Sequence, residues 1–279
     1  MDPPLVGGEV LPSPGARITE YMSILVFLCW ALAVSSSTPI EQRFPTPQGA
    51  VRSTPAEGSF AAYLRALPLL PAGSPVLTYS GALKSRQDVH AAVVDLSVGT
   101  KDLQQCADAV IRLRAEHLFA QGRISEIHFQ FTNGFRTSLE RWMNGERIKV
   151  VGNTCSWVLS AAPDRSHAAL LAYLDVVFTY AGTLSLSREL KAVAEEPIEA
   201  GDVFIHGGSP GHAVIVVDAA RMSDGRCAFL LAQSYMPAQR IHVLKNLQRP
   251  DLGAWYIEGD GDQLRTPEWT FAWTDRKRW

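Results

Sequence analysis

Three apolar runs between residues 201 and 235 constrain the fold of this chain more than any other stretch. The segment reads GDVFIHGGSPGHAVIVVDAARMSDGRCAFLLAQSY. Its apolar runs, Val203–Ile205, Ala213–Val217 and Cys227–Ala232, are separated by Gly, Pro, Ser and Asp residues that favour turns. This pattern predicts three consecutive antiparallel strands.

The turn between the second and third strands decides which residues face each other. If Val217 pairs with Ala228, His212 lies opposite Gln233 and the two side chains share a face. A neutral imidazole that acts as a base needs a neighbour that fixes its tautomer and ring orientation, and a glutamine amide can do this. We therefore expect His212 to be a base and Gln233 to orient it.

Cys106 is the candidate nucleophile. Asp102 and Gln105 form a capping-box pattern, which predicts a helix over Asp102–Gln121 with Cys106 in its first turn. Free N–H groups and the helix dipole favour a thiolate at that position. A buried packing role for the same cysteine remains open, because an apolar stripe follows it along the helix. Cys155, on an expected half-buried strand, is a second candidate nucleophile.

A cysteine at a helix start, a histidine that opens a strand and a polar residue on the next strand resemble the papain-like cysteine hydrolases, in particular the NlpC/P60 and CHAP cell-wall amidases. The resemblance implies an α+β fold with a papain-like core. In such a core an antiparallel sheet packs on the helix that bears Cys106, and residues 122–200 form a long insertion.

A second resemblance is to an uncharacterised bacterial family catalogued as a domain of unknown function, number 4846. It implies an exported, bacterial, single-domain protein and covers about Arg43 to Phe271. The phrases that carry it are DLQQCADAVIRLRAEHL, FTNGFR, FTYAGTLSL, GDVFIHGGSPGHAVIVVD, LLAQSYMPAQRIHVLKN and TPEWTF.

The amino-terminal residues predict export. After Met22 comes SILVFLCWALAVSSS, a short apolar run that ends in small residues, as secretory signals do. An uncleaved anchor is the alternative, although the run is shorter than the ~20 residues that span a bilayer. We expect residues 1–40 to be a signal peptide and disordered leader, and residues 41–279 to form one α+β domain that is periplasmic or otherwise exported and has no membrane span after processing.

Composition excludes some partners and leaves free thiols. Acidic and basic residues nearly balance, with a formal net charge of −2. The sequence also lacks the basic stripe that nucleic-acid-binding proteins carry, so we expect no nucleic-acid partner. Beyond residue 40 the chain has three cysteines, Cys106, Cys155 and Cys227, so at least one thiol is free or joins another chain. We expect a monomer without a cofactor or metal.

The Gly-rich segment allows three other interpretations. Ser209 lies in a G-x-S-x-G pattern, but an α/β-hydrolase elbow needs a helix directly after the serine. His206 and His212 could bind a metal with Asp202 or Asp218. The histidines could also be solvated residues of a hairpin.

Two function hypotheses follow. In the first, Cys106, His212 and Gln233 hydrolyse an amide or ester in a cell-wall peptide or another small envelope substrate, which contacts Gly208, Ser209, Tyr235 and Trp269. In the second, the same fold is a non-catalytic envelope-binding module that holds a glycan or partner through its aromatic C-terminal segment and the GGSPG turn.

Overall fold

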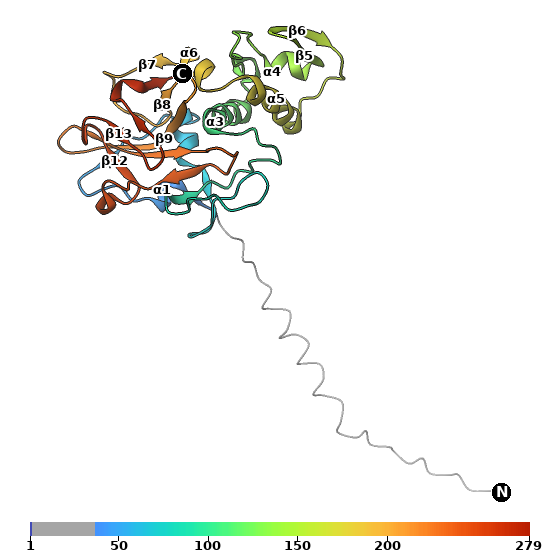
Figure 1. Cartoon of the computed structure of the whole chain (residues 1–279). Coiled ribbons are helices and arrows are strands. Elements are labelled where there is room, and N and C mark those ends of the chain that lie inside the picture. Colours follow the sequence, from blue (N-terminus) through green and yellow to red (C-terminus); the bar gives the residue numbers. More distant parts are fainter. Residues whose placement is uncertain (2–36) are drawn as a thin grey trace. The chain divides into compact units, whose positions relative to one another are not determined.

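The computed structural model describes Met1 and residues 37–279 (Figure 1). The predicted signal run lies in residues 2–36, outside the described residues. The folded unit begins slightly before the boundary at residue 41 that the sequence indicated. Strand β1 (Thr38–Pro39) pairs with β3 (Pro68–Leu69), and Ile40, the first residue of helix α1 (Ile40–Arg43), is fully buried in the core. An apolar side chain that packs in the core holds these residues in the fold.

The centre of the fold is a nine-stranded sheet in which neighbouring strands pair antiparallel, as the sequence predicted. The predicted three-strand unit is present as neighbours β8, β9 and β10. The order across the sheet is β4 (His90–Val93), β11 (His242–Leu244), β10 (Cys227–Gln233), β9 (His212–Arg221), β8 (Val203–His206), β15 (Arg276–Arg278) and β7 (Lys191–Ala192), while β12 (Trp255–Ile257) pairs with β10 and β2 (Val51–Arg52) with β9.

The predicted register of β9 and β10 was wrong. Ala228 pairs with Ala220, not Val217, because β9 runs on to Arg221 and the turn after it is tighter than expected. The polar Asp218 does not end the strand, since it is ion-paired with Arg52 inside the fold. A β-bulge opposite Leu230 and Leu231 then shifts the register by one residue.

The helices follow local start signals. Ser59 caps α2 (Phe60–Arg65) and Ser166 caps α5 (His167–Tyr180), as expected from serine before an apolar run. The residues after α5 form α6 (Thr183–Glu189), in which Thr183, Ser185 and Leu186 are buried. Burial of this short face stabilises a helix that local propensity does not indicate.

The segment between α3 (Cys106–Ala120) and β8 is the one that the papain-like resemblance treats as a long insertion, although its last strand, β7, belongs to the central sheet. It contains η1 (Ile124–Glu126), α4 (Leu139–Met143), the hairpin of β5 (Glu146–Val151) and β6 (Thr154–Leu159), α5 and α6. After η1, the chain makes one isolated bridge between Gln130 and Arg136 around a turn at Asn133 and Gly134. In Figure 1, α4, α5 and this hairpin lie together at one end of the folded unit.

Both faces of the central sheet are covered. One face packs on α3, and Ile215 and Leu230 are among its buried contacts. The other face carries Phe204 and Phe229, which pack against the C-terminal segment with β13 (Leu264–Arg265), β14 (Thr270–Phe271) and η3 (Trp273–Asp275); η2 (Pro250–Leu252) precedes β12. Because both faces are apolar, the central strands read as continuous apolar runs.

No single helix in residues 37–279 has the length and hydropathy to cross a membrane; α5 and α6 pass such a test only when counted together, with a bend of 104° between them.

Candidate active site

Cys106 is the first residue of α3, so the predicted position in the first turn is confirmed, but the predicted cap is not. The helix begins after Gln105, whose backbone N–H donates to the Asp108 carboxylate at 3.0 Å. Asp102 lies before the helix and accepts instead from the N–H of Ala238 at 2.7 Å. The N-terminal turn of α3 is therefore tied to the residues that follow β10.

A second, buried contact joins the residues before α3 to those that follow β10. The Oγ atom of Ser234 is fully buried and lies 2.9 Å from the carbonyl oxygen of Gln104 and 2.7 Å from that of Gln239. Ser234 follows Gln233, and Gln104 precedes Cys106 by two residues. This contact therefore sets the distance between the helix that carries the thiol and the strand that carries the amide.

His212 opens β9 and is almost completely buried. Its Nε2 atom lies 2.8 Å from Oε1 of Gln233, so the predicted contact between the imidazole and the amide is present despite the different register. The backbone of Ala213, the residue after His212, is close enough to the Cys106 sulfur to oppose part of the rise in the thiol pKa. The thiol therefore lies against the start of the strand that carries the imidazole.

Aromatic rings hold the His212 imidazole in place. Its centroid lies 5.1 Å from that of Tyr235, 5.6 Å from that of Trp269 and 6.0 Å from that of Phe271. Trp255 and Tyr256, in contrast, are buried in the core. The aromatic residues of the C-terminal segment thus have two roles, one in the core and one at the site.

The Gly-rich loop between β8 and β9 is anchored on α6. The Thr183 hydroxyl donates to the carbonyl of Gly208 at 3.1 Å and accepts from its N–H at 3.3 Å. Gly211 has no room for a side chain, because a Cβ atom there would lie 2.5 Å from both the Gly208 carbonyl oxygen and the Thr183 hydroxyl. The glycine lets the loop pass this close to α6 and holds Ser209 at the mouth of a cavity.

That cavity has a volume of about 510 Å³ and collects the residues that the sequence singled out. Cys106, His212, Gly208, Ser209, Tyr235 and Trp269 all line it. Gln233 does not; it lies behind the His212 ring and reaches the cavity only through that ring.

Burial makes the resting pair neutral. It raises the pKa of the Cys106 thiol to about 11, with a smaller contribution from the nearby Asp108 carboxyl, and it lowers the pKa of His212 to about 4. The sequence expectation of a thiolate favoured by the helix start therefore meets a larger opposing effect, the loss of water around the sulfur. A neutral imidazole is, however, the form that can accept a proton.

Two residues of the site were missed from the sequence. Glu268 accepts from the Gln233 amide at 2.6 Å, and it is also ion-paired with Lys84 at 2.5 Å. Both charged side chains are nearly buried, with exposed fractions of 8% for Glu268 and 3% for Lys84. Neither stands in a recognisable motif, and a buried ion pair between residues so far apart in sequence has no local signal.

The alternative sites are not assembled. Asp202 is ion-paired with Arg276 at 2.9 Å and Asp218 with Arg52 at 2.7 Å, so neither carboxylate faces the two histidines of the loop as a free ligand. Residues 37–279 contain no group of three His, Cys, Asp or Glu side chains that could hold a metal. Ser209 is followed by strand β9 and not by the helix that a nucleophile elbow requires.

The other two thiols lie outside the cavity that contains Cys106. Cys155 is on β6, where its sulfur accepts from the Asn133 amide at 3.3 Å, and Cys227 is buried on β10. Cys106, Cys155 and Cys227 are all free thiols.

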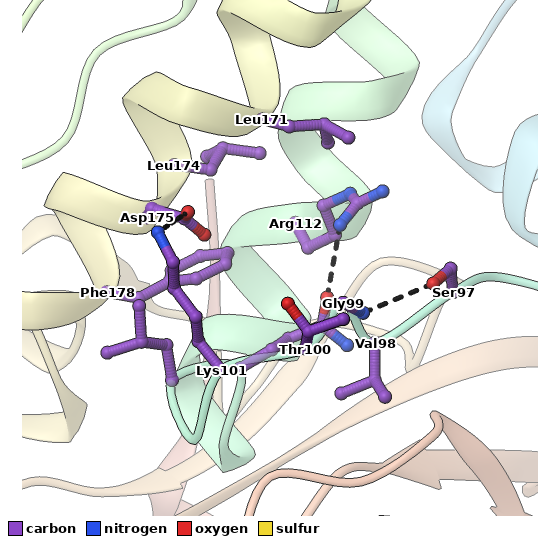
Figure 2. Close-up of a pocket in the computed structure, with 12 residues that line it drawn as sticks. Ser97, Val98, Gly99, Thr100, Lys101, Arg112, Leu171, Leu174, Asp175 and Phe178 are labelled. Atoms are coloured by element: carbon purple, nitrogen blue, oxygen red, sulfur yellow. Dashed lines mark hydrogen bonds and ion pairs between the residues drawn. The ribbon is translucent and has the colours of Figure 1, made fainter. Parts of the chain in front are cut away.

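A smaller cavity of about 170 Å³ adjoins the first, and Leu103 and Phe178 contribute to both. Figure 2 shows it between α3 and α5, with the ion pair of Lys101 and Asp175 at 2.7 Å on one side and Arg112 on the other. It contains none of the residues predicted for the site, and both of its cations are already paired, Lys101 with Asp175 and Arg112 with Glu116.

Comparison with known proteins gives one match. The model of a family described as Domain of unknown function (4846) matches residues 40–278. No curated protein and no solved structure matches.

Proposed function

Since the chain belongs to the family described as Domain of unknown function (4846), whose description names no activity, we propose its function from the cavity itself: a cysteine hydrolase that cleaves an amide or ester bond. The observation that carries the proposal is the meeting of Cys106 and His212 at one cavity, with Gln233 bonded to Nε2 of the imidazole. This is the set of roles that nucleophilic catalysis requires. The same arrangement of Cys106, His212 and Gln233 supports our further proposal that the fold has a papain-like core.

The neutral pair acts by general-base catalysis. His212 takes the thiol proton as the Cys106 sulfur attacks the substrate carbonyl carbon, and the carbonyl electrons move to oxygen. The free N–H groups in the first turn of α3 stabilise that oxyanion. The intermediate collapses, and the leaving amine or alkoxide takes the proton from the imidazolium. Water, deprotonated by His212, then hydrolyses the thioester; the acid leaves and the thiol is restored.

The cavity limits the substrate to a small acyl group or a short peptide. Tyr235 and Trp269 provide apolar contact area, and the backbone of Gly208 and the hydroxyl of Ser209 provide polar groups at the mouth. A peptide of the cell wall is the substrate class we favour, because the protein is also proposed to be exported. Intact-mass measurement of the periplasmic form tests export, with a mature N-terminus expected between residues 34 and 38.

A second candidate function is a binding module of the same fold. The observation in its favour is the thiol pKa of about 11, which makes Cys106 a weak nucleophile without help from His212. In this alternative, the aromatic lining of the cavity holds a glycan or peptide without chemistry.

Acylation of the enzyme separates the two candidates. We expect intact-protein mass spectrometry to show one acyl group on Cys106 after incubation with p-nitrophenyl acetate, and turnover of soluble peptidoglycan peptides to require the same residue. His212→Ala should slow acylation by at least about 100-fold. Cys155→Ser and Cys227→Ser are matched controls and should acylate normally. A folded protein that acylates at no cysteine, or equally at all three, would favour the binding module.

A further inference from the structure

The hydrogen-bonding partners of the Gln233 side chain fix which way round its amide oxygen and NH₂ group lie. Its Oε1 atom lies 2.8 Å from Nε2 of His212. Its Nε2 atom lies 2.6 Å from a carboxylate oxygen of Glu268 and 3.4 Å from Nε2 of His242. Gln233 is 1% exposed, so its partners are protein groups and not bulk water. The orientation of this amide can be worked out from those partners.

Glu268 gives the first constraint. Its other carboxylate oxygen is ion-paired with the ammonium of Lys84 at 2.5 Å, so the carboxylate is held as an acceptor. An amide placed against it must present its NH₂ group. If Gln233 were turned over, two oxygens would face each other in a buried site, which is costly.

His242 gives a second constraint in the same direction. Its Nδ1 atom lies 2.9 Å from the carbonyl oxygen of Arg240, which can only accept, so Nδ1 carries the hydrogen. Burial lowers the pKa of His242 to about 3, and the ring is neutral. Its Nε2 atom is then a bare acceptor for the second N–H of the Gln233 amide, with the longer distance making this the weaker contact.

The proton on His212 follows from these constraints. The Gln233 oxygen faces Nε2 of His212 and can only accept, so Nε2 must carry the hydrogen. In the neutral ring, Nδ1 then holds the lone pair. A base that takes a proton from Cys106 needs this lone pair.

The geometry points to Glu268 as a positioning residue that, through Gln233, sets the tautomer of His212 so that Nδ1 is the basic nitrogen. The role in catalysis rests on the proposed cysteine hydrolase, whereas the tautomer itself does not. Lys84 takes part by donating to the other carboxylate oxygen of Glu268 at 2.5 Å.

Glu268→Gln is the decisive change. The Lys84 ammonium only donates, so it selects the oxygen of the new amide and turns its NH₂ group towards Gln233. The contact with position 268, at 2.6 Å, outweighs the 3.4 Å contact with His242, so Gln233 turns over and its NH₂ group faces His212. We expect His212 to change from the Nε2–H to the Nδ1–H tautomer, and Cys106 acylation to fall by at least about tenfold.

The measurement is a long-range ¹H–¹⁵N correlation spectrum of histidine-labelled protein, with the His212 signals assigned by their loss in His212→Asn. The double variant Glu268→Gln with Lys84→Met is the matched control. Without the ammonium, the new amide is free to present its oxygen to Gln233, and the Nε2–H tautomer should return. Circular dichroism checks that each variant is folded.

Two results would overturn the inference: an Nδ1–H tautomer in the wild type, which can be read even if the variants fail to fold, or an unchanged tautomer in a folded Glu268→Gln variant. A tautomer that behaves as expected in a protein that never acylates at Cys106 would instead refute the hydrolase and leave the positioning role of Glu268 intact.

Discussion

The Nε2 atom of His212 lies 2.8 Å from Oε1 of Gln233 although the two residues are diagonal neighbours across β9 and β10. The strands end their pairing at Ala232 and Ile215, so the same register places Gln233 opposite Val214, which is two residues from His212. Residues i and i+2 on a strand share a face, and a diagonal contact of this kind is within reach of a long side chain. Glutamine has the length to make it.

Removal of the Gln233 amide should be visible at His212. The hydrogen bond to Gln233 favours the protonated ring, so we expect Gln233→Ala to lower the pKa of His212 further below its value of about 4. An NMR titration of the ring measures this. Gln239→Ala, which removes another buried amide without contact to His212, should leave the titration unchanged. A His212 pKa that rises in Gln233→Ala would contradict the assigned hydrogen bond.

The reactivity of Cys106 should follow its buried environment. Because the thiol pKa is raised to about 11, the thiolate fraction increases about tenfold per pH unit up to that value. We expect the rate of iodoacetamide labelling at Cys106 to rise through pH 9 without a plateau, and to be slow at pH 6. Peptide mass spectrometry across pH 6 to 10 measures it in a Cys155→Ser, Cys227→Ser background. A plateau below pH 8 would show a stable thiolate–imidazolium pair.

Asp108 should make the fold less stable as the pH rises. Burial raises the pKa of its carboxyl to about 8 from an ordinary value near 3.8, so the folded protein keeps a proton that the unfolded chain releases. Folded-state stability is therefore lost between about pH 4 and pH 8. The Asp108→Asn side chain stays neutral at every pH. Between pH 5 and pH 8, the free energy of unfolding of this variant should therefore increase by at least about 1 kcal/mol relative to that of the wild type.

Urea unfolding at both pH values measures this gain. The exposed Asp262→Asn is the control, and its difference from the wild type should not change with pH. A loss of stability for Asp108→Asn that grows towards pH 8 would mean that the carboxylate is charged and favourable in the fold.

Gly211 should tolerate no side chain. A Cβ atom would lie 2.5 Å from both the Gly208 carbonyl oxygen and the Thr183 hydroxyl, and the loop would have to move. We expect Gly211→Ala to cost about 1–3 kcal/mol in the free energy of unfolding. Gly182→Ala is a matched control beside the same threonine, because nothing lies within 4 Å of its Cβ position. Equal stabilities of the two variants in chemical denaturation would rule out a tightly fixed loop.

Much of the candidate site could be predicted because its signals are local. Cys106 starts a helix, His212 starts a strand and Gln233 ends the next one, and periodicity and turn residues indicate all three positions. The contact between His212 and Gln233 was expected even though the register was not, because a shift of the pairing by two residues keeps both side chains on one face.

The sequence by itself determined an antiparallel unit of three strands, a helix that begins near Cys106, and one sheet face on which an imidazole and an amide meet, because each of these depends on neighbours in the chain. Only the tertiary structure decided the protonation of the site. Lys84 and Glu268 are 184 positions apart, and they orient Gln233 only because the fold buries them side by side. The neutral thiol has the same origin: its pKa depends on how much water the surrounding protein removes, which no local pattern records.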